Sequence, residues 1–288
     1  MRQVLNDPRL EQQFDKDGYV IVDLLSQQEL QEIRNTFRDF VEEGKRGLKN
    51  VESSYKLSFF NSDGEYRSRV LQTIADFFQA KVDKYLKGYK PLIINLFDKE
   101  PGGGEVPIHQ NWTFVDERKY TSVSVWIPLQ DVSRENGTLE VVKGSHRVLT
   151  DFRSPTIPWV FEDLFTELKE KYLQPLNLTA GQVGIIDDSI IHWSSENKTN
   201  ANRAAIQLIM VPEEAVPLHY YMDPAGNKDK LEVFEVDAGF FTTFNMLEKP
   251  KNVKSIGYID FKPFKYTEEE MVEIIAKNNP AIRGLATA

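Results

Sequence analysis

The sequence predicts an all-β core of the jelly-roll or closed double-sheet type, flanked by helices. One observation is a series of short apolar or alternating segments in the middle of the chain, at 91–97, 120–129, 138–142, 182–186 and 204–211. Another is that the first ninety residues instead repeat their apolar residues at helical spacing. Numerous short strands joined by turns are typical of jelly rolls and other closed double sheets.

The segment 120–129 gives the clearest strand pattern. Its apolar β-branched residues and its other residues alternate, so that one face would carry Val123, Val125 and Ile127 and the other Ser122, Ser124 and Trp126. Strict alternation indicates a strand with two different environments. Asn136-Gly137 supplies a turn before the strand predicted at 138–142.

Capping signals mark the predicted helices. Ser26 and Glu29 form a capping box, and the apolar residues behind it recur at helical spacing. Residues 70–86 predict a second helix, and Thr267–Glu270 another capping box near the C-terminus.

We therefore expect one domain over 1–288, with a helical N-terminal part at 1–90. The β core would span 91–211 with a helical insert at 151–176, followed by a C-terminal extension at 212–288.

Composition limits the classes of partner. The chain has 288 residues, 41% of them hydrophobic, and a formal net charge of −9. This charge argues against nucleic-acid or anionic-membrane surfaces, which need basic patches. The absence of cysteine excludes disulfides, thiolate metal sites and cysteine nucleophiles. With no signal-peptide pattern and no long apolar run, we expect a soluble, cytoplasmic protein whose partner is a small-molecule substrate.

Two of the four histidines stand in contexts that suggest metal chemistry. His109 precedes the alternating strand, and if it lies on a strand then His109 and Asn111 point to the same face. His192 follows an apolar strand that ends in polar residues. Eleven residues later, Arg203 opens the last core strand, where a buried guanidinium needs an anion. Either an acidic side chain nearby or the carboxylate of a bound molecule could be that anion.

For the other two histidines, a structural or surface position is favoured over metal binding. His146 ends a Gly-Ser-His turn and is predicted to brace that loop. For His219, in Pro217–Tyr221, a surface position is favoured over a place in the pocket.

Four segments in order resemble the phytanoyl-CoA dioxygenase family over about residues 14–211. They are Phe14-Asp-Lys-Asp-Gly-Tyr-Val-Ile-Val22, Val125-Trp-Ile-Pro-Leu-Gln-Asp131, Asn136-Gly-Thr-Leu-Glu-Val-Val-Lys-Gly-Ser-His146, and His192-Trp-Ser-Ser-Glu-Asn197 with Arg203. The resemblance implies a cupin-like double-stranded β-helix that holds Fe(II) through two histidines and one carboxylate. It also implies use of O2 and oxidative decarboxylation of 2-oxoglutarate to succinate, usually with hydroxylation of a substrate.

By matching positions, the resemblance assigns roles to individual residues. His109 and His192 would be iron ligands, with position 111 as the third. Arg203 would bind the distal carboxylate of 2-oxoglutarate, and Asn95 and Trp126 would line the co-substrate pocket. We expect three residues that flank the first ligand to shape the substrate pocket: Gln110, Trp112 and Phe114.

Position 111 departs from the family pattern, which is His-x-Asp. Asn111 offers a neutral oxygen, and losing the anionic ligand removes roughly 4 kcal/mol of attraction at a surface-like effective dielectric. Four explanations remain open: a weak neutral ligand in a working oxygenase, an external halide as in related halogenases, a degenerate site, or an introduced substitution. A nearby carboxylate is a candidate surrogate: Asp116, Asp187 or Asp188.

Two functions from different classes follow. The first is an iron(II)/2-oxoglutarate hydroxylase of a small metabolite, and the second is a non-catalytic protein that holds an acid in the same barrel. Segments 44–66 and 213–260 are rich in aromatic residues and are expected to form a lid or a partner surface. Substrate identity and oligomeric state are not predicted.

Overall fold

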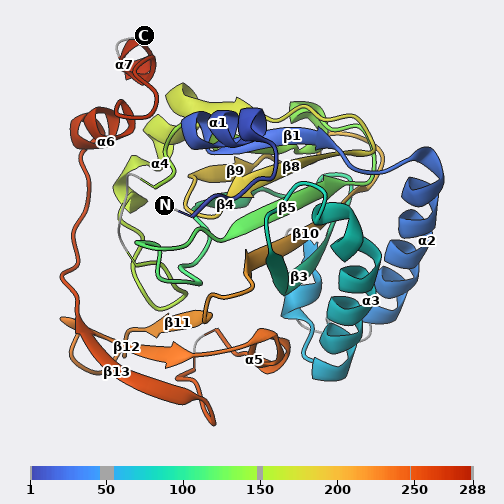
Figure 1. The fold of residues 1–288 in the computed structure, drawn as a ribbon. Coiled ribbons are helices and arrows are strands. Elements are labelled where there is room, and N and C mark those ends of the chain that lie inside the picture. Colours follow the sequence, from blue (N-terminus) through green and yellow to red (C-terminus); the bar gives the residue numbers. More distant parts are fainter. Residues whose placement is uncertain (1, 46–54, 148–151, 247, 287–288) are drawn as a thin grey trace.

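Two antiparallel sheets of the computed structural model enclose the centre of the molecule (Figure 1). The structure describes residues 2–45, 55–147, 152–246 and 248–286. Part of the aromatic-rich segment 44–66 therefore lies outside the described residues. Together the two sheets form the predicted jelly roll.

The larger sheet has six strands in the order β1-β8-β5-β10-β3-β2. Their bounds are β1 Tyr19–Asp23, β8 Gln182–Asp187, β5 Val123–Pro128, β10 Arg203–Pro212, β3 Tyr89–Lys99 and β2 Lys56–Leu57. The smaller sheet has four strands in the order β4-β9-β6-β7. Their bounds are β4 Val106–His109, β9 His192–Ser194, β6 Leu139–Val142 and β7 Leu173–Pro175.

Three N-terminal helices cover the outer face of the larger sheet (Figure 1). They are α1 Pro8–Asp17, α2 Gln27–Gly44 and α3 Gly64–Val82, and α2 begins at the predicted Ser26 capping box. Val123, Val125 and Ile127 pack into this helix–sheet core, each fully buried. The predicted alternation of β5 is therefore confirmed, because its other face turns to the interior between the sheets.

The helical insert is short and irregular. It comprises the 3-10 turn Glu162–Leu164, α4 Phe165–Glu167 and the π-helical turn Leu168–Tyr172. It packs with α6 Glu268–Ile275 and α7 Ile282–Ala286 against the smaller sheet. A further 3-10 turn, Ser58–Phe60, follows β2, and another, Arg134–Asn136, leads into β6.

The C-terminal extension contains a sheet that the sequence did not predict. Strands β11 Leu218–Tyr221, β12 Lys230–Glu235 and β13 Lys254–Asp260 pair in that order and lie at the bottom of Figure 1, near α5 Ala238–Thr243. The surface position predicted for His219 is wrong, because the residue is 3% exposed in β11. Its ring packs 5.0 Å from that of Phe244, because α5 folds back over the strand.

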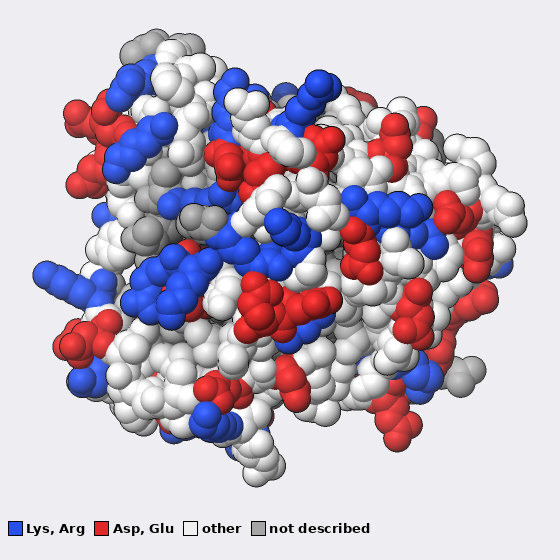
Figure 2. All heavy atoms as spheres, viewed as in Figure 1, with Lys and Arg blue, Asp and Glu red and all other residues white. Residues whose placement is uncertain are grey.

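Charges on the surface are mixed. Figure 2 shows a band of basic side chains across the middle of one face, bordered on both sides by acidic side chains. Among the described residues, no helix has the length and apolar character that crossing a bilayer requires.

Candidate metal and co-substrate site

A cavity of about 220 Å³ opens between the two sheets. Strands β3, β5 and β10 of the larger sheet and β4, β6 and β9 of the smaller sheet contribute side chains to its wall. Of the predicted site residues, the lining includes Asn95, His109, Asn111, Trp112, Phe114, Trp126, His192 and Arg203. Residues separated by more than one hundred positions thus meet in one place.

His109 and His192 face each other across the β4–β9 pair. They are register partners, and their ring centroids lie 4.2 Å apart. His109 Nδ1 lies 2.7 Å from the Pro107 carbonyl and His192 Nδ1 lies 2.9 Å from the Ile190 carbonyl. Because a carbonyl only accepts, each Nδ1 carries the proton and each Nε2 keeps its lone pair for a metal.

Burial disfavours the charged form of both rings. Burial lowers the pKa of His109, and burial together with the neighbouring His109 lowers the pKa of His192 to about 3. Neutral imidazoles are the form that binds metals without first losing a proton.

Asn111 reaches the same cavity from a loop. β4 ends at His109, so the expectation that His109 and Asn111 share one strand is wrong. The backbone N–H of Asn111 instead donates to the Asp188 carbonyl over 3.0 Å, which holds the loop against the end of β8. The side chain still reaches the cavity wall, because this hydrogen bond replaces strand pairing.

The Asn111 amide has a defined orientation. Its Nδ2 donates to Ser124 Oγ over 2.9 Å and to Asp188 Oδ1 over 2.7 Å. Both N–H groups are therefore used, and within the described ranges the carbonyl Oδ1 has no internal partner. An amide carbonyl oxygen is a neutral ligand for a divalent metal.

These bonds continue across β5, β10 and β3. Gln207 Nε2 donates to Ser124 Oγ over 3.1 Å, and Asn95 Nδ2 donates to Gln207 Oε1 over 2.9 Å. Ser124 Oγ donates to Asp188 Oδ1 over 2.7 Å. The chain of donors thus runs from Asn95 to the carboxylate of Asp188, which accepts at its end.

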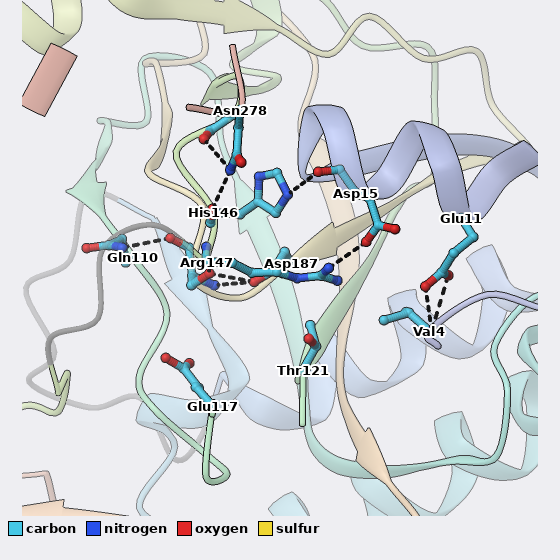
Figure 3. Close-up of polar contacts among 12 residues, drawn as sticks. Val4, Glu11, Asp15, Gln110, Glu117, Thr121, His146, Arg147, Asp187 and Asn278 are labelled. Atoms are coloured by element: carbon cyan, nitrogen blue, oxygen red, sulfur yellow. Dashed lines mark hydrogen bonds and ion pairs between the residues drawn. The ribbon is translucent and has the colours of Figure 1, made fainter. Parts of the chain in front are cut away.

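Of the three candidate surrogates, only Asp188 contacts Asn111. It is 1% exposed, and burial raises its pKa to about 7 against the lowering effect of hydrogen bonds from Ser124 and Asn111. Asp187 instead accepts from Arg147 Nε over 2.8 Å, and Figure 3 shows this pair with Asp15 on its far side. Asp116 is bound by Arg118 outside the cavity.

Arg203 enters the same cavity from the first position of β10. It is 2% exposed, and among the described residues no carboxylate forms an ion pair with it. Its Nη2 donates to Ser194 Oγ over 3.3 Å, while Nε has no partner in the described part of the chain. A buried guanidinium without an ion-pair partner and with a free Nε donor is suited to a bound carboxylate.

A second buried cation, Lys99, stands behind Arg203. It lies opposite Arg203 in the β3–β10 strand pair and is fully buried. Its Nζ donates to Ser194 Oγ over 2.9 Å and to the Ser195 carbonyl over 2.6 Å. Burial and the charge of Arg203 lower the pKa of Lys99 to about 7.

The residues predicted to shape the substrate pocket divide into two groups. Trp112 and Phe114 line the cavity, with Tyr55, Phe59 and Phe60 nearby in its wall. Gln110 does not line it, because its Nε2 donates to the Ser189 carbonyl over 2.7 Å and its Oε1 accepts from Trp159 over 3.2 Å. Gln110 therefore serves to fix the loop that carries Asn111.

His146 lies away from this cavity and braces the structure. Its Nε2 donates to the Asp15 carbonyl over 3.1 Å, and its own carbonyl accepts from Asn278 over 2.9 Å (Figure 3). It is fully buried, as a loop-bracing residue would be.

Four polar residues of the site were missed at the sequence level: Lys99, Ser124, Ser194 and Gln207. The period-2 rule offered a signal for them. Lys99 lies four residues after Asn95, Ser194 two after His192, and Gln207 four after Arg203, each on the same face of its strand. For Ser124, the alternation of its strand predicts the face that it shares with Trp126, but it does not predict the hydrogen bonds of its hydroxyl.

The fold and these side chains define a jelly roll whose inner cavity gathers two histidines, an asparagine and a buried arginine. Within the described ranges no three His, Cys, Asp or Glu side chains cluster closely enough to hold a metal by themselves. The two free Nε2 atoms and the unpartnered carbonyl oxygen of Asn111 line the same cavity and are donor types that suit a divalent first-row metal, and Arg203, which has no ion-pair partner, suits an acid.

Comparisons with known proteins point to one family. The family model described as phytanoyl-CoA dioxygenase (PhyH) matches residues 14–205, so the chain belongs to this family. The chain is 30% identical over 128 residues to phytanoyl-CoA dioxygenase 1 of Oryza sativa subsp. japonica, covering 40% of this chain and 42% of the relative. It is 32% identical over 130 residues to phytanoyl-CoA dioxygenase domain-containing protein 1 of Danio rerio, covering 42% of this chain and 45% of the relative.

The chain thus spans less than half the length of these relatives.

Among solved structures, the non-heme alpha ketoglutarate dependent carbocyclase SnoK from nogalamycin biosynthesis matches with a TM-score of 0.52 at 18% identity, covering 73% of this chain and 86% of that one. HygX from Streptomyces hygroscopicus, with nickel, 2-oxoglutarate and hygromycin B bound, matches with a TM-score of 0.51 at 13% identity, covering 72% and 88%. These likenesses establish the double-stranded β-helix fold.

Proposed function

We propose that this protein is an iron(II)- and 2-oxoglutarate-dependent oxygenase that hydroxylates a small molecule. The observation that supports it most is the convergence of three metal donors and one unpaired guanidinium in a single cavity. Membership of the phytanoyl-CoA dioxygenase family agrees with this chemistry.

His109, Asn111 and His192 would hold the iron. Bound there, the metal supplies the activation of O2 that couples decarboxylation of 2-oxoglutarate to oxidation of the substrate. The protein contributes rigidity, because the carbonyls of Pro107 and Ile190 fix both imidazole tautomers.

Arg203 would orient the co-substrate. Its guanidinium fork can take the distal carboxylate in two-point contact, with Ser194 Oγ as a further polar neighbour. Asn95 Oδ1 is buried in the same wall without a partner in the described residues, and Trp126 covers the cavity with an apolar face. Together these groups exclude water from around the keto acid.

The rest of the cavity wall suits an uncharged substrate. Among its described lining residues Arg203 is the only one with a formal charge, and 2-oxoglutarate would occupy it. Near the first metal ligand Trp112 packs edge-on against Phe59 at 5.9 Å and Phe244 at 5.8 Å. The substrate group that enters the cavity would therefore be apolar or a ring.

Asn111 gives one specific reason to keep a second function in view. A neutral third ligand weakens metal binding, and the same cavity without metal is a binding site for an acid at Arg203. A non-catalytic acid-binding protein would hold 2-oxoglutarate equally well with and without iron.

The deciding experiment is an anaerobic Fe(II) titration in the presence of 2-oxoglutarate, followed by O2 and quantification of succinate. The keto acid chelated to iron gives a weak visible charge-transfer band, so metal binding and turnover are read separately. Arg203→Met is the matched variant, since it removes the charge and keeps an unbranched side chain.

For the oxygenase we expect the band and slow, uncoupled succinate formation. Arg203→Met should raise the 2-oxoglutarate concentration for half-saturation by at least ~30-fold, the effect of about 2 kcal/mol lost at a buried charge pair. Binding of 2-oxoglutarate with no band and no succinate would refute the oxygenase and favour the acid-binding protein.

A further inference from the structure

The side chain behind Asn111 is a buried carboxylate. Asp188 accepts from Asn111 Nδ2 over 2.7 Å and from Ser124 Oγ over 2.7 Å, both at Oδ1. It lies one residue past β8, and its backbone carbonyl also accepts the N–H of Asn111. Asn111 is thus tied to Asp188 through both its main chain and its side chain.

The direction of these bonds determines which atom of the amide is available. A carboxylate oxygen needs a donor, so the NH2 group of Asn111 must turn toward Asp188. The carbonyl Oδ1 then turns away from Asp188. Without this acceptor the amide could rotate by 180° and present a donor, which a metal ion rejects.

An aspartate at position 111 would change this environment. One of its carboxylate oxygens would take the place of Nδ2, 2.7 Å from Asp188 Oδ1. Two carboxyl groups can share that contact only if one of them carries a proton, whereas the amide of asparagine needs none. The neighbourhood is therefore complementary to asparagine.

We propose that Asp188 is the positioning residue that makes Asn111 a metal ligand. Asn111 supplies the oxygen, and Asp188, which accepts from its NH2 group, determines that this oxygen and not the NH2 turns away from Asp188. The pair together does what a single carboxylate ligand does elsewhere. This inference rests on the proposed metal site and concerns how that site binds its metal.

The geometry also indicates how to test it. In Asp188→Asn the new carbonyl oxygen can accept the two existing hydrogen bonds. Its NH2 replaces Oδ2, which has no hydrogen bond within the described structure, and Ser122 Oγ, near enough to lower the pKa of Asp188, can accept from that NH2. The main chains already touch there, since Asp188 N donates to the Ser122 carbonyl over 3.2 Å. The variant should therefore fold, but an amide at position 188 can donate as well as accept, so it no longer forces the NH2 of Asn111 to turn toward it.

The experiment is anaerobic calorimetric titration of Fe(II), and of Mn(II) as a redox-inert probe, into the metal-free protein. The variants are Asp188→Asn, Asn111→Asp and the exchanged pair Asn111→Asp/Asp188→Asn, and thermal unfolding of each metal-free protein is the second readout. Glu140→Gln is the control. Glu140 is a 2% exposed carboxylate in the sheet of the two histidines, but it pairs with Arg134 and does not line the cavity.

We expect Asp188→Asn to bind metal 10- to 100-fold more weakly with its unfolding temperature unchanged or higher. Asn111→Asp should lower the unfolding temperature of the metal-free protein, and the exchanged pair should restore both that temperature and metal binding. Glu140→Gln should leave metal affinity unchanged.

Parental metal affinity in Asp188→Asn would overturn the proposal, as would an unaltered unfolding temperature in Asn111→Asp. Failure of the parent protein to bind either metal would overturn it as well. These outcomes can be told apart from failure of the oxygenase proposal. If the parent protein binds metal as expected but forms no succinate, the proposed oxygenase activity is refuted and the proposed role of Asp188 is not.

Discussion

Replacing Lys99 with methionine would remove a buried charge from behind the cavity while nearly preserving side-chain length. Lys99 Nζ and Arg203 Nη2 donate to the same atom, Ser194 Oγ, over 2.9 and 3.3 Å. A carboxylate bound by Arg203 would then lie roughly 7 Å from Nζ. At an effective dielectric constant of about 20 the attraction is about 2 kcal/mol, equivalent to about 30-fold in affinity for 2-oxoglutarate.

This contribution should depend on pH. The pKa of Lys99 is lowered to about 7, first by burial and then by Arg203, while Glu105 and Glu196 act in the opposite direction. Below pH 7 the lysine is charged before the acid binds. Above pH 7 it must take up a proton on binding, at a cost of about 1.4 kcal/mol per pH unit. The advantage over methionine should therefore vanish between about pH 8 and 9.

The assay is calorimetric binding of 2-oxoglutarate to the Mn(II)-loaded protein at pH 6, 7, 8 and 9, in buffers of different ionisation enthalpy. We expect Lys99→Met to bind about 30-fold more weakly at pH 6 and equally at pH 9, with proton uptake only in the parent protein. Equal affinity at pH 6, or a constant deficit at every pH, would refute the reasoning.

Stability gives an independent check with a defined sign. Because the pKa of Lys99 is lowered in the folded state, the folded protein binds fewer protons than the unfolded chain between about pH 7 and 10.5. Its contribution to stability therefore rises with pH across that window. In urea unfolding, Lys99→Met should remove this part of the dependence of the unfolding free energy on pH. The loss of the lysine's hydrogen bonds shifts the unfolding free energy by the same amount at every pH and does not affect this comparison.

Two further predictions concern the cavity wall and the loop before β10. Trp112→Ala should abolish stimulation of succinate formation by a good substrate and leave the uncoupled rate within about twofold, since Trp112 packs against Phe59 in the aromatic part of the cavity wall. An equal fall in both rates would contradict this role. Asn197→Ala should lower stability by about 3 kcal/mol, because the fully buried amide donates to the carbonyls of Lys99 over 3.0 Å and Ala201 over 2.7 Å. Scanning calorimetry should show a fall of about 6 °C or more, and a shift under 2 °C would mean that water replaces these bonds.

Local sequence patterns were sufficient for most of the barrel. Strands predicted at 91–97, 120–129 and 204–211 correspond to β3, β5 and β10, because alternation and apolar runs are set by the burial of each strand face. Short or polar strands were missed. β4 and β9 have four and three residues, too few for a periodic signal, although they carry both histidines.

The C-terminal extension shows another limit of local patterns. β11, β12 and β13 form a small sheet whose outer strand is mostly exposed, so its sequence lacks the apolar alternation of a core strand. His219 lies in β11 of this same small sheet. Its burial depends on α5, and nothing in the residues around His219 encodes the approach of that helix.

The sequence by itself determined the fold class, the helical and strand segments with strong periodicity, and the residue types that a metal and an acid would need. Chemistry of that kind is carried by side-chain identity and spacing along one strand. Only the tertiary structure decided which of Asp116, Asp187 and Asp188 stands behind Asn111, and that Lys99 and Arg203 share one serine hydroxyl. Such contacts join strands distant in sequence, and their distances follow from sheet pairing and register, which no single segment specifies.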